Sequence, residues 1–452
     1  MSSITTPKPN GPHFSVGVAL DGAGWHPAAW RETTARPGDL FSAGYWQRLV
    51  DIAEAAGVDY VTIEDALRLQ SAPALGRDDN HDDHDNSGER RDSDINPAIV
   101  EGRLDALLTA SWIAPRTRTI GLIPTVTTTH TEPFHVATAL QTLDHVSNGR
   151  AGWQLRFSAD QASADAFGRG PAPQIDAARV LAGEPDAELD ALIDDASDVA
   201  EVARKLWDSW EDDAIIRDVA TGRFLDRDRV HHINFTGDNF SVVGPSIVPR
   251  SPQGQIVVTL LAHAAPIYAL AARAADVVFI TPENDALQAG ASRGKSVAAI
   301  IAEVRAAEAA EDRAALGLQP LRIVADLVVA LDTALDAATA TSFASDARIA
   351  AGSATEIADL IAAWHAAGID GVRLRPAVLP TDLELIARDL LPILRERGLA
   401  APELATTEPA ATELATTAPT APEHRVTLRE RFGLAPADNR YRAERAPQED
   451  AA

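Results

Sequence analysis

The stretch YWQRLVDIAEAAGVDYVTI, residues 45–63, decides the fold class. Its first part repeats apolar residues with the period of an amphipathic helix, at Trp46, Leu49, Ile52, Ala53 and Ala56. Gly57 follows as a helix C-cap, and residues 59–63 then form a short apolar strand. A helix that runs through a glycine into a buried strand is the repeating unit of a parallel α/β fold.

The same pattern recurs along the chain. A helical face around Ile357 and Trp364 ends at Gly368 and leads into residues 371–374, and residues 269–275 lead into 276–280. Eight strands are predicted in all, around 14–20, 59–64, 119–124, 151–157, 256–261, 275–280, 321–330 and 370–375. Because eight parallel strands close a barrel, we predict an α/β fold of the (β/α)8 TIM type with insertions.

A doubly wound open sheet is the main alternative to the barrel. Such sheets that bind dinucleotides carry a G-x-G-x-x-G turn after a strand. Residues 21–25 (DGAGW) are only a fragment of that motif and lead to Pro27 instead of a third glycine. The motif pattern therefore favours the barrel.

Composition divides the chain into a barrel and less regular segments. We predict one barrel domain over residues 1–399, with a disordered acidic insertion at about 76–94 that has almost no apolar side chains. A solvated charge run explains its histidines and aspartates better than a metal site does. Residues 400–424 repeat Ala, Thr, Pro and Glu and are predicted to be a flexible linker. Residues 425–452 are expected to dock on the barrel.

Charge and composition together exclude several classes of function. The formal net charge is −26, which repels nucleic-acid phosphates. No apolar run approaches the roughly 20 residues that a membrane span needs. The chain has no cysteine, so disulfide and thiolate chemistry are excluded. The polar N-terminus shows no secretory signal, so we expect a cytoplasmic protein.

Polar and aromatic residues follow the predicted strands, at the end where ligands bind in a parallel barrel. His26 is the best candidate for a catalytic side chain, and Trp30 and Arg31 in the same loop are candidates for substrate contact. The later strand ends add candidates for cofactor binding: Asp65, Thr125, Thr127, Gln154, Ser158 and His263. Aromatic faces with a few hydroxyls and amides suit a flat heterocycle better than a sugar or a metal. Asp65 has the alternative role of capping the following helix.

Several of these segments resemble one enzyme family. They are residues 24–31 (GWHPAAWR), 120–129, 142–153 (TLDHVSNGRAGW), 206–214 (LWDSWEDDA), 252–255 and the tail 427–434 (TLRERFGL). Together they resemble the bacterial luciferase-like, flavin-dependent monooxygenases, in the branch of nitrilotriacetate monooxygenase component A, pristinamycin synthase and dibenzothiophene-sulfone monooxygenase.

This resemblance implies a (β/α)8 barrel that holds reduced FMN at its strand ends and contains no metal. A separate NAD(P)H:flavin reductase supplies the flavin, dioxygen reacts with it, and a small organic substrate is oxygenated. The family aspartate and threonine match Asp65 and Thr125, and the family serine after the fourth strand matches Ser158. The resemblance also implies a homodimer.

The match departs from the family pattern at the end that binds the flavin phosphate. Gln154 replaces a family asparagine, and Leu189 and Ile193 stand where the family has a histidine and a tyrosine. Ala264 replaces a serine in the turn after the fifth strand, where His263 could partly substitute. Each lost contact to a phosphate dianion is worth roughly 1.5–3 kcal/mol, so the changes predict weakened FMN binding.

Three readings of the function follow. The leading one is an FMN-dependent monooxygenase acting on a small organic substrate. A second is a non-catalytic paralogue, serving as a partner subunit or ligand-binding barrel, that has lost its flavin phosphate contacts. A third is a relative that uses a deazaflavin or another flavin.

Overall fold

The computed structural model describes residues 13–70, 99–176, 179–180, 183–284, 294–331, 343, 345–401 and 426–442. The acidic insertion predicted at 76–94 lies outside these residues, as does the predicted linker from residue 402 onward.

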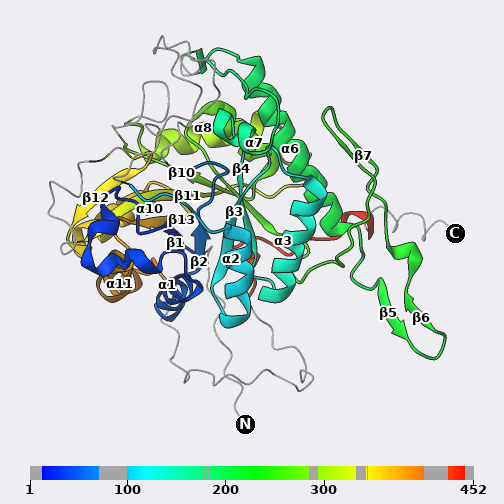
Figure 1. Cartoon of the computed structure of the whole chain (residues 1–452), viewed down its shortest axis with the longest axis horizontal. Helices are drawn as coiled ribbons and strands as arrows, with labels where there is room; N and C mark the ends of the chain where they lie inside the picture. Colours follow the sequence, from blue (N-terminus) through cyan, green and yellow to red (C-terminus); the bar gives the residue numbers. More distant parts are fainter. Residues whose placement is uncertain are drawn as a thin grey trace.

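Eight parallel strands close into a barrel (Figure 1). Each strand pairs with its neighbour in sequence, and β1 pairs with the last one, β13, so the ring has no open edge. The strands are β1 (Ser15–Leu20), β2 (Tyr60–Ile63), β3 (Gly121–Thr127), β4 (Gly152–Arg156), β9 (Val257–Leu261), β10 (Val277–Ile280), β11 (Arg322–Leu331) and β13 (Gly371–Pro376). All eight predicted strands are thus confirmed, and the open sheet is excluded. A ninth strand, β12 (Arg348–Gly352), pairs with β11 outside the ring.

Helices cover the outside of the barrel between successive strands (Figure 1). The main ones are α1 (Ala43–Ala55), α2 (Ala106–Ile113), α3 (Pro133–Ser147), α6 (Ala187–Asp208), α7 (Ala265–Ala274), α8 (Val297–Ala310) and α10 (Ala354–Ala366). The short helices are α4 (Gln161–Ala166), α11 (Thr381–Leu385), α12 (Leu391–Glu396) and α13 (Leu428–Arg431). No helix in the described ranges has the length and apolar character needed to cross a membrane.

The stretch 45–63 folds as its pattern predicts. The Ser42 side chain caps α1 by accepting a hydrogen bond from the Tyr45 backbone N–H. Trp46 and Leu49 on the apolar face are buried. Gly57 ends the helix with φ of 73°, a left-handed conformation that glycine adopts without steric cost, and the chain turns directly into β2.

The C-terminal segment 426–442 closes the barrel at the end where the strands begin. Leu428 is fully buried among apolar side chains that point into the barrel, including Tyr60, Ile123 and Phe432. The backbone N–H of Leu428 donates to the Gly149 carbonyl oxygen at 2.9 Å. A plug contributed by the far end of the sequence thus completes the inner core.

Two glycines make room for this plug. A Cβ added to Gly121 would lie 2.5 Å from one Leu428 methyl carbon, and one added to Gly152 would lie 2.9 Å from the other. Side chains at these first positions of β3 and β4 would occupy the space that Leu428 fills. The barrel therefore depends on the tail for part of its inner packing.

Replacing Leu428 by alanine is expected to lower the free energy of unfolding by about 2–4 kcal/mol, because a fully buried leucine leaves a cavity. Val426→Ala is the matched control in the same segment, since Val426 is 48% exposed and should change stability by less than about 0.5 kcal/mol. Urea unfolding of both variants measures the difference. Equal stabilities of the two variants would show that the tail is not part of the cooperative core.

Candidate active site

Side chains alternate along each strand between the barrel interior and the surrounding helices. On β2 the inward residues are Tyr60, Thr62 and Glu64 just beyond its end. Tyr60 packs in the apolar lower part with Phe279 and Phe432. Going up toward the carboxyl ends of the strands, the interior changes from apolar to polar.

A buried ion pair marks this change. Arg373 on β13 lies opposite Asp326 on β11 in the strand register and is fully buried. Its Nε and Nη2 donate to the two carboxylate oxygens of Asp326 at 2.7 and 2.5 Å. The guanidinium carbon lies 3.9 Å from the centroid of the Phe279 ring, so the cation sits directly on the apolar layer.

Nη1 of Arg373 links β4 and the end of β2 to this pair through hydrogen bonds. Nη1 donates to the Gln154 side-chain oxygen on β4 at 2.6 Å, and the Gln154 amide donates to Glu64 at 3.1 Å. Arg375, two residues along β13, also donates to Asp326. Four strands are therefore linked through one continuous polar layer, which forms the floor of the barrel mouth.

Arg375 extends the layer to the segment before β12. Its Nη1 donates to Asp346 at 2.5 Å, and its guanidinium lies 4.4 Å from the centroid of the Trp25 ring. Burial alone would lower the pKa of Arg375, but the charges of Asp326 and Asp346 raise it above its ordinary value. For Asp346, burial favours the protonated form, yet Arg375 and His263 hold its pKa far below the usual range. Arg375 and Asp346 are thus both charged at neutral pH.

Three predicted cofactor residues lie on the inward face, one within this floor and two on the neighbouring strand β3. Gln154 is part of the network, and Thr125 is its register partner on β3. Thr127 lies two residues further along β3 and therefore also points inward. The Thr125 hydroxyl is buried and has no hydrogen-bond partner among the described residues. It is a polar group that the folded chain itself leaves unsatisfied.

Asp65 and Ser158 hold structural positions beside the mouth. The Asp65 carboxylate accepts hydrogen bonds from the backbone N–H of Ala66 at 2.7 Å and of Ala106, the first residue of α2, at 2.9 Å. Burial raises the pKa of Asp65, and these two bonds oppose the rise. The Ser158 hydroxyl donates to Asp160, which caps α4.

His26 is buried in the loop after β1. Its Nδ1 accepts from the Ala28 backbone N–H at 3.0 Å, so the neutral ring carries its proton on Nε2. The ring meets Phe343 edge-on at 4.8 Å. Trp30 is half-buried against the core, and the exposed Arg31 guanidinium lies 5.4 Å from the Trp30 ring centroid.

His263 lies at the end of β9, on the other side of the mouth. Its Nδ1 is 2.8 Å from the Thr281 hydroxyl, and its Nε2 is 3.5 Å from Asp346. Ala264 begins α7 without a side-chain cap, and Pro266 removes one backbone N–H from the first turn. This turn therefore offers few backbone donors to a bound anion.

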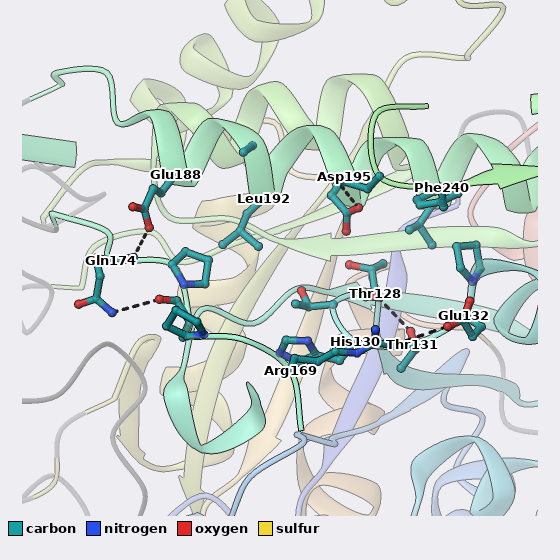
Figure 2. A pocket seen from close by; sticks show the side chains of 18 residues that line it. Thr128, His130, Thr131, Glu132, Arg169, Gln174, Glu188, Leu192, Asp195 and Phe240 are labelled. Carbon is teal, nitrogen blue, oxygen red and sulfur yellow. Dashed lines mark hydrogen bonds and ion pairs between the residues drawn. The ribbon is translucent and has the colours of Figure 1, made fainter. Parts of the chain in front are cut away.

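A cavity of about 750 Å³ opens beside the ends of β3 and β4, between the loop after β3 and α6 (Figure 2). This is within the range of roughly 300–1,000 Å³ typical of small-molecule sites. Leu192 and Asp195 of α6 point down toward His130 and Arg169 in Figure 2. Leu189 and Ile193 are buried on α6 and are not among the residues that line the cavity. Burial and the Arg169 charge lower the pKa of His130, so this wall is neutral at His130.

Three arginines near the mouth were not anticipated from the sequence: Arg68, Arg103 and Arg156. Arg156 Nη1 donates to the Asp65 carbonyl oxygen at 2.9 Å, Arg103 pairs with Asp21 at 3.1 Å, and Arg68 lies 3.6 Å from Asp160. Burial raises the pKa of Asp21, although Arg103 opposes this. Arg156 continues the inward alternation of β4 from Gln154, which was the available sequence signal.

Comparison with known proteins identifies the family of the chain. The family model described as luciferase-like monooxygenase matches residues 23–371, which include six of the eight barrel strands and the loops at their ends. The chain belongs to the luciferase-like monooxygenase family. It is therefore an enzyme of the flavin-dependent monooxygenase class, and the resemblance of its motifs to that family is confirmed.

Individual relatives agree with this assignment. N-acetyl-S-(2-succino)cysteine monooxygenase of Bacillus subtilis is 27% identical over 95% of this chain and 98% of its own length. Nitrilotriacetate monooxygenase component A of Aminobacter aminovorans is 32% identical over 60% of this chain and 54% of its own length. The solved structure of EDTA monooxygenase from Chelativorans sp. BNC1 superposes with a TM-score of 0.68 at 21% identity, over 94% of this chain and 98% of that one, which shows the shared fold.

One side of the mouth has polar groups that could bind a flavin ring, and the other side has few donors for a flavin phosphate. Thr125 Oγ1 and the buried Trp25 Nε1 have no hydrogen-bond partner among the described residues, as expected where a heterocycle supplies acceptors. On the α7 side, His263 is already engaged and the helix start provides few donors for a phosphate. No group of three or more potential metal ligands occurs among the described residues.

Asp326→Asn is expected to lower the free energy of unfolding by about 3–5 kcal/mol, because it leaves two buried arginines without their shared countercharge. Asp389→Asn is the control: its pair with Arg388 is solvent-exposed and should contribute less than about 0.5 kcal/mol. Chemical unfolding at pH 7 measures both. Similar losses in the two variants would mean that the polar layer does not hold the barrel together.

Proposed function

We propose that this enzyme oxygenates a small organic substrate with reduced FMN and dioxygen. A separate NAD(P)H:flavin reductase supplies the flavin in the cytoplasm, and the enzyme acts as a homodimer. The observation that carries the proposal is the buried, unpartnered Thr125 hydroxyl at the barrel mouth of a chain that belongs to the luciferase-like monooxygenase family. A buried hydroxyl without a partner costs free energy, so a ligand that completes it is favoured.

The protein's part in this reaction is to position the flavin and to exclude water from it. Reduced flavin, when bound, supplies the electrons that activate dioxygen. In the proposed arrangement the Thr125 hydroxyl and the Trp25 indole N–H donate hydrogen bonds to the ring, while Thr127 and Gln154 line its surroundings. The Arg373–Asp326 pair fixes the floor beneath it, because Gln154 is held at 2.6 Å from Arg373. Close packing at the mouth limits solvent: a cavity beside Asp21, Glu64 and Arg103 has about 10 Å³, room for roughly one water.

Roles for the substrate follow from the loop after β1. His26 is buried with Nε2 as its proton-bearing nitrogen, so it can hold or deliver a proton at that atom. Trp30 and Arg31 in the same loop are proposed to contact the substrate. The cavity of about 750 Å³ beside β3 and β4 is the proposed route for substrate toward the flavin.

Titration of the purified protein with FMN and with reduced FMN tests the proposal directly. Saturable binding of reduced FMN is expected, weaker than micromolar because Leu189, Ile193 and Ala264 offer no phosphate donors. Fluorescence, or protection of reduced FMN from air oxidation, measures it. No saturation by either form up to millimolar concentration would instead support the non-catalytic paralogue, and preference for a reduced deazaflavin would support the third reading.

Thr125→Val should weaken the binding of reduced flavin about tenfold, because the change removes one hydrogen-bond donor and keeps the side-chain shape. Thr142→Val is the control, since that hydroxyl on α3 is already bonded to the Thr138 carbonyl oxygen at 2.8 Å. The ratio of dissociation constants is the measurement. If Thr125→Val binds flavin as tightly as the control does, the proposed ring contact is excluded.

A further inference from the structure

The helix starts at the barrel mouth are poorly suited to hold an anion. A helix start binds a phosphate through free backbone N–H groups and the positive end of its dipole. Within the described residues, each helix of eight or more residues between the strands begins with a capping side chain or with a proline in its first turn. The caps are Ser42 of α1, Asp105 of α2, Asp186 of α6, Ser296 of α8 and Ser353 of α10, and the prolines are Pro133 of α3 and Pro266 of α7.

The start of α6 already carries negative charge. The Asp186 carboxylate accepts hydrogen bonds from the backbone N–H of Glu188 at 3.1 Å and of Leu189 at 3.0 Å. The bond from Leu189 lowers the pKa of Asp186, so this carboxylate is charged at neutral pH. Glu188 and Asp190 add two more carboxyl groups to the first turn. A phosphate dianion at this helix start would therefore be repelled.

The guanidinium groups of the mouth are also occupied. Four of them face carboxylates and one donates to a backbone carbonyl oxygen: Arg68 with Asp160, Arg103 with Asp21, Arg373 with Asp326, Arg375 with Asp326 and Asp346, and Arg156 with Asp65. Together with Glu64 and the Asp65 side chain, these residues contain six carboxyl groups and five guanidinium groups, a formal charge of −1. A dianion entering the mouth would meet cations whose charge is already balanced.

The donors that lack a partner at the mouth are mainly neutral. They include the Thr125 hydroxyl and the Trp25 indole N–H, which suit the uncharged acceptors of a flavin ring. The buried Nε atoms of Arg103 and Arg375 also have no hydrogen-bond partner among the described residues, but both guanidinium groups are paired with a carboxylate. Recognition of a phosphate depends on charge-assisted donors, which are stronger than neutral ones.

The cavity beside β3 and β4 is no better place for a phosphate (Figure 2). The charged groups of its lining are the carboxyl groups of Glu132, Glu188 and Asp195 and the guanidinium of Arg169, which lies 3.7 Å from Glu132. Burial lowers the pKa of His130, so this ring adds no positive charge at neutral pH. The net charge of −26 on the whole chain adds a repulsion that acts over a longer range.

We propose that the flavin site of this chain does not select for the terminal phosphate, so that reduced riboflavin binds at least as tightly as reduced FMN. The proposal rests on the flavin site of the proposed function and deepens it by naming the part of the flavin that is recognised. Riboflavin has the same ring and ribityl chain as FMN and differs in lacking the phosphate. Each charge-assisted contact to the phosphate would instead favour FMN by about tenfold or more.

Anaerobic titration of the full-length protein with reduced riboflavin and with reduced FMN tests the proposal. Quenching of tryptophan fluorescence measures both dissociation constants. In about 20 mM NaCl the constant for reduced riboflavin should be equal to or lower than that for reduced FMN, because the acidic chain repels the dianion. In about 500 mM NaCl the constant for reduced FMN should fall toward that for riboflavin, since salt screens this repulsion. The constant for riboflavin should change less than about twofold.

Asp346→Asn tests the role of charge at the mouth. The substitution removes the carboxylate that faces Arg375 and His263, so reduced FMN should bind about threefold more tightly or better, with riboflavin unchanged. Asp359→Asn is the matched control, because it makes the same chemical change on α10 at a side chain that is 66% exposed. The control should leave the ratio of the two dissociation constants unchanged. Circular dichroism and thermal unfolding verify that both variants fold.

The outcomes separate this proposal from the proposed function. Reduced FMN that binds ten or more times as tightly as reduced riboflavin, with a preference that weakens in salt, would overturn the proposal and leave the proposed function intact. An Asp346→Asn variant that changes the constants of both flavins equally would also count against it. Saturation by neither flavin up to millimolar concentration would overturn both.

Discussion

The bidentate pair of Arg373 and Asp326 is the constraint on which the rest of the mouth depends. Removing two charges from water costs several kcal/mol each, which only good geometry and further hydrogen bonds repay. Here the strand register places the two residues opposite each other, and Gln154 and Arg375 satisfy the remaining groups. The pair therefore fixes side chains from separate strands in one layer, below which the interior is apolar and above which ligands can bind.

Much of the fold could be read from the sequence because it is specified locally. Each helix, glycine and short strand carries its own periodic signal, as residues 45–63 do, and eight such signals close a barrel. The plug at Leu428 is different. It lies more than 300 positions from Gly121 in the sequence, so the mutual fit of a leucine and two glycines leaves no local pattern.

The candidate site was predictable in position but less so in detail. The sequence pattern placed Thr125, Thr127, Gln154 and His263 on the inward side of the strand ends. Side chains alternate along a strand, and each of these residues stands an even number of positions from an inward residue of its strand. The same alternation explains why the neighbours Glu64 and Asp65 have different partners. The Glu64 side chain points inward and joins the inner network, whereas the Asp65 side chain accepts a hydrogen bond from the start of α2. Arg373 and Arg375 are two apart inside an apolar strand, so their common inward face was readable, whereas their partner Asp326 required the register of two strands.

The distribution of charge differs between the barrel mouth and the chain as a whole. The chain is strongly acidic overall, yet its barrel mouth gathers arginines on β4, β13 and the loops after β2. Most of these arginines are paired with a nearby carboxylate, so the mouth has little unpaired positive charge that could bind a phosphate. In the proposed site, the unpartnered Thr125 and Trp25 atoms would therefore bind the flavin ring, while the start of α7 would offer little to its phosphate. A flavin held mainly by its ring would exchange readily, which suits the proposed supply of reduced FMN by a separate reductase.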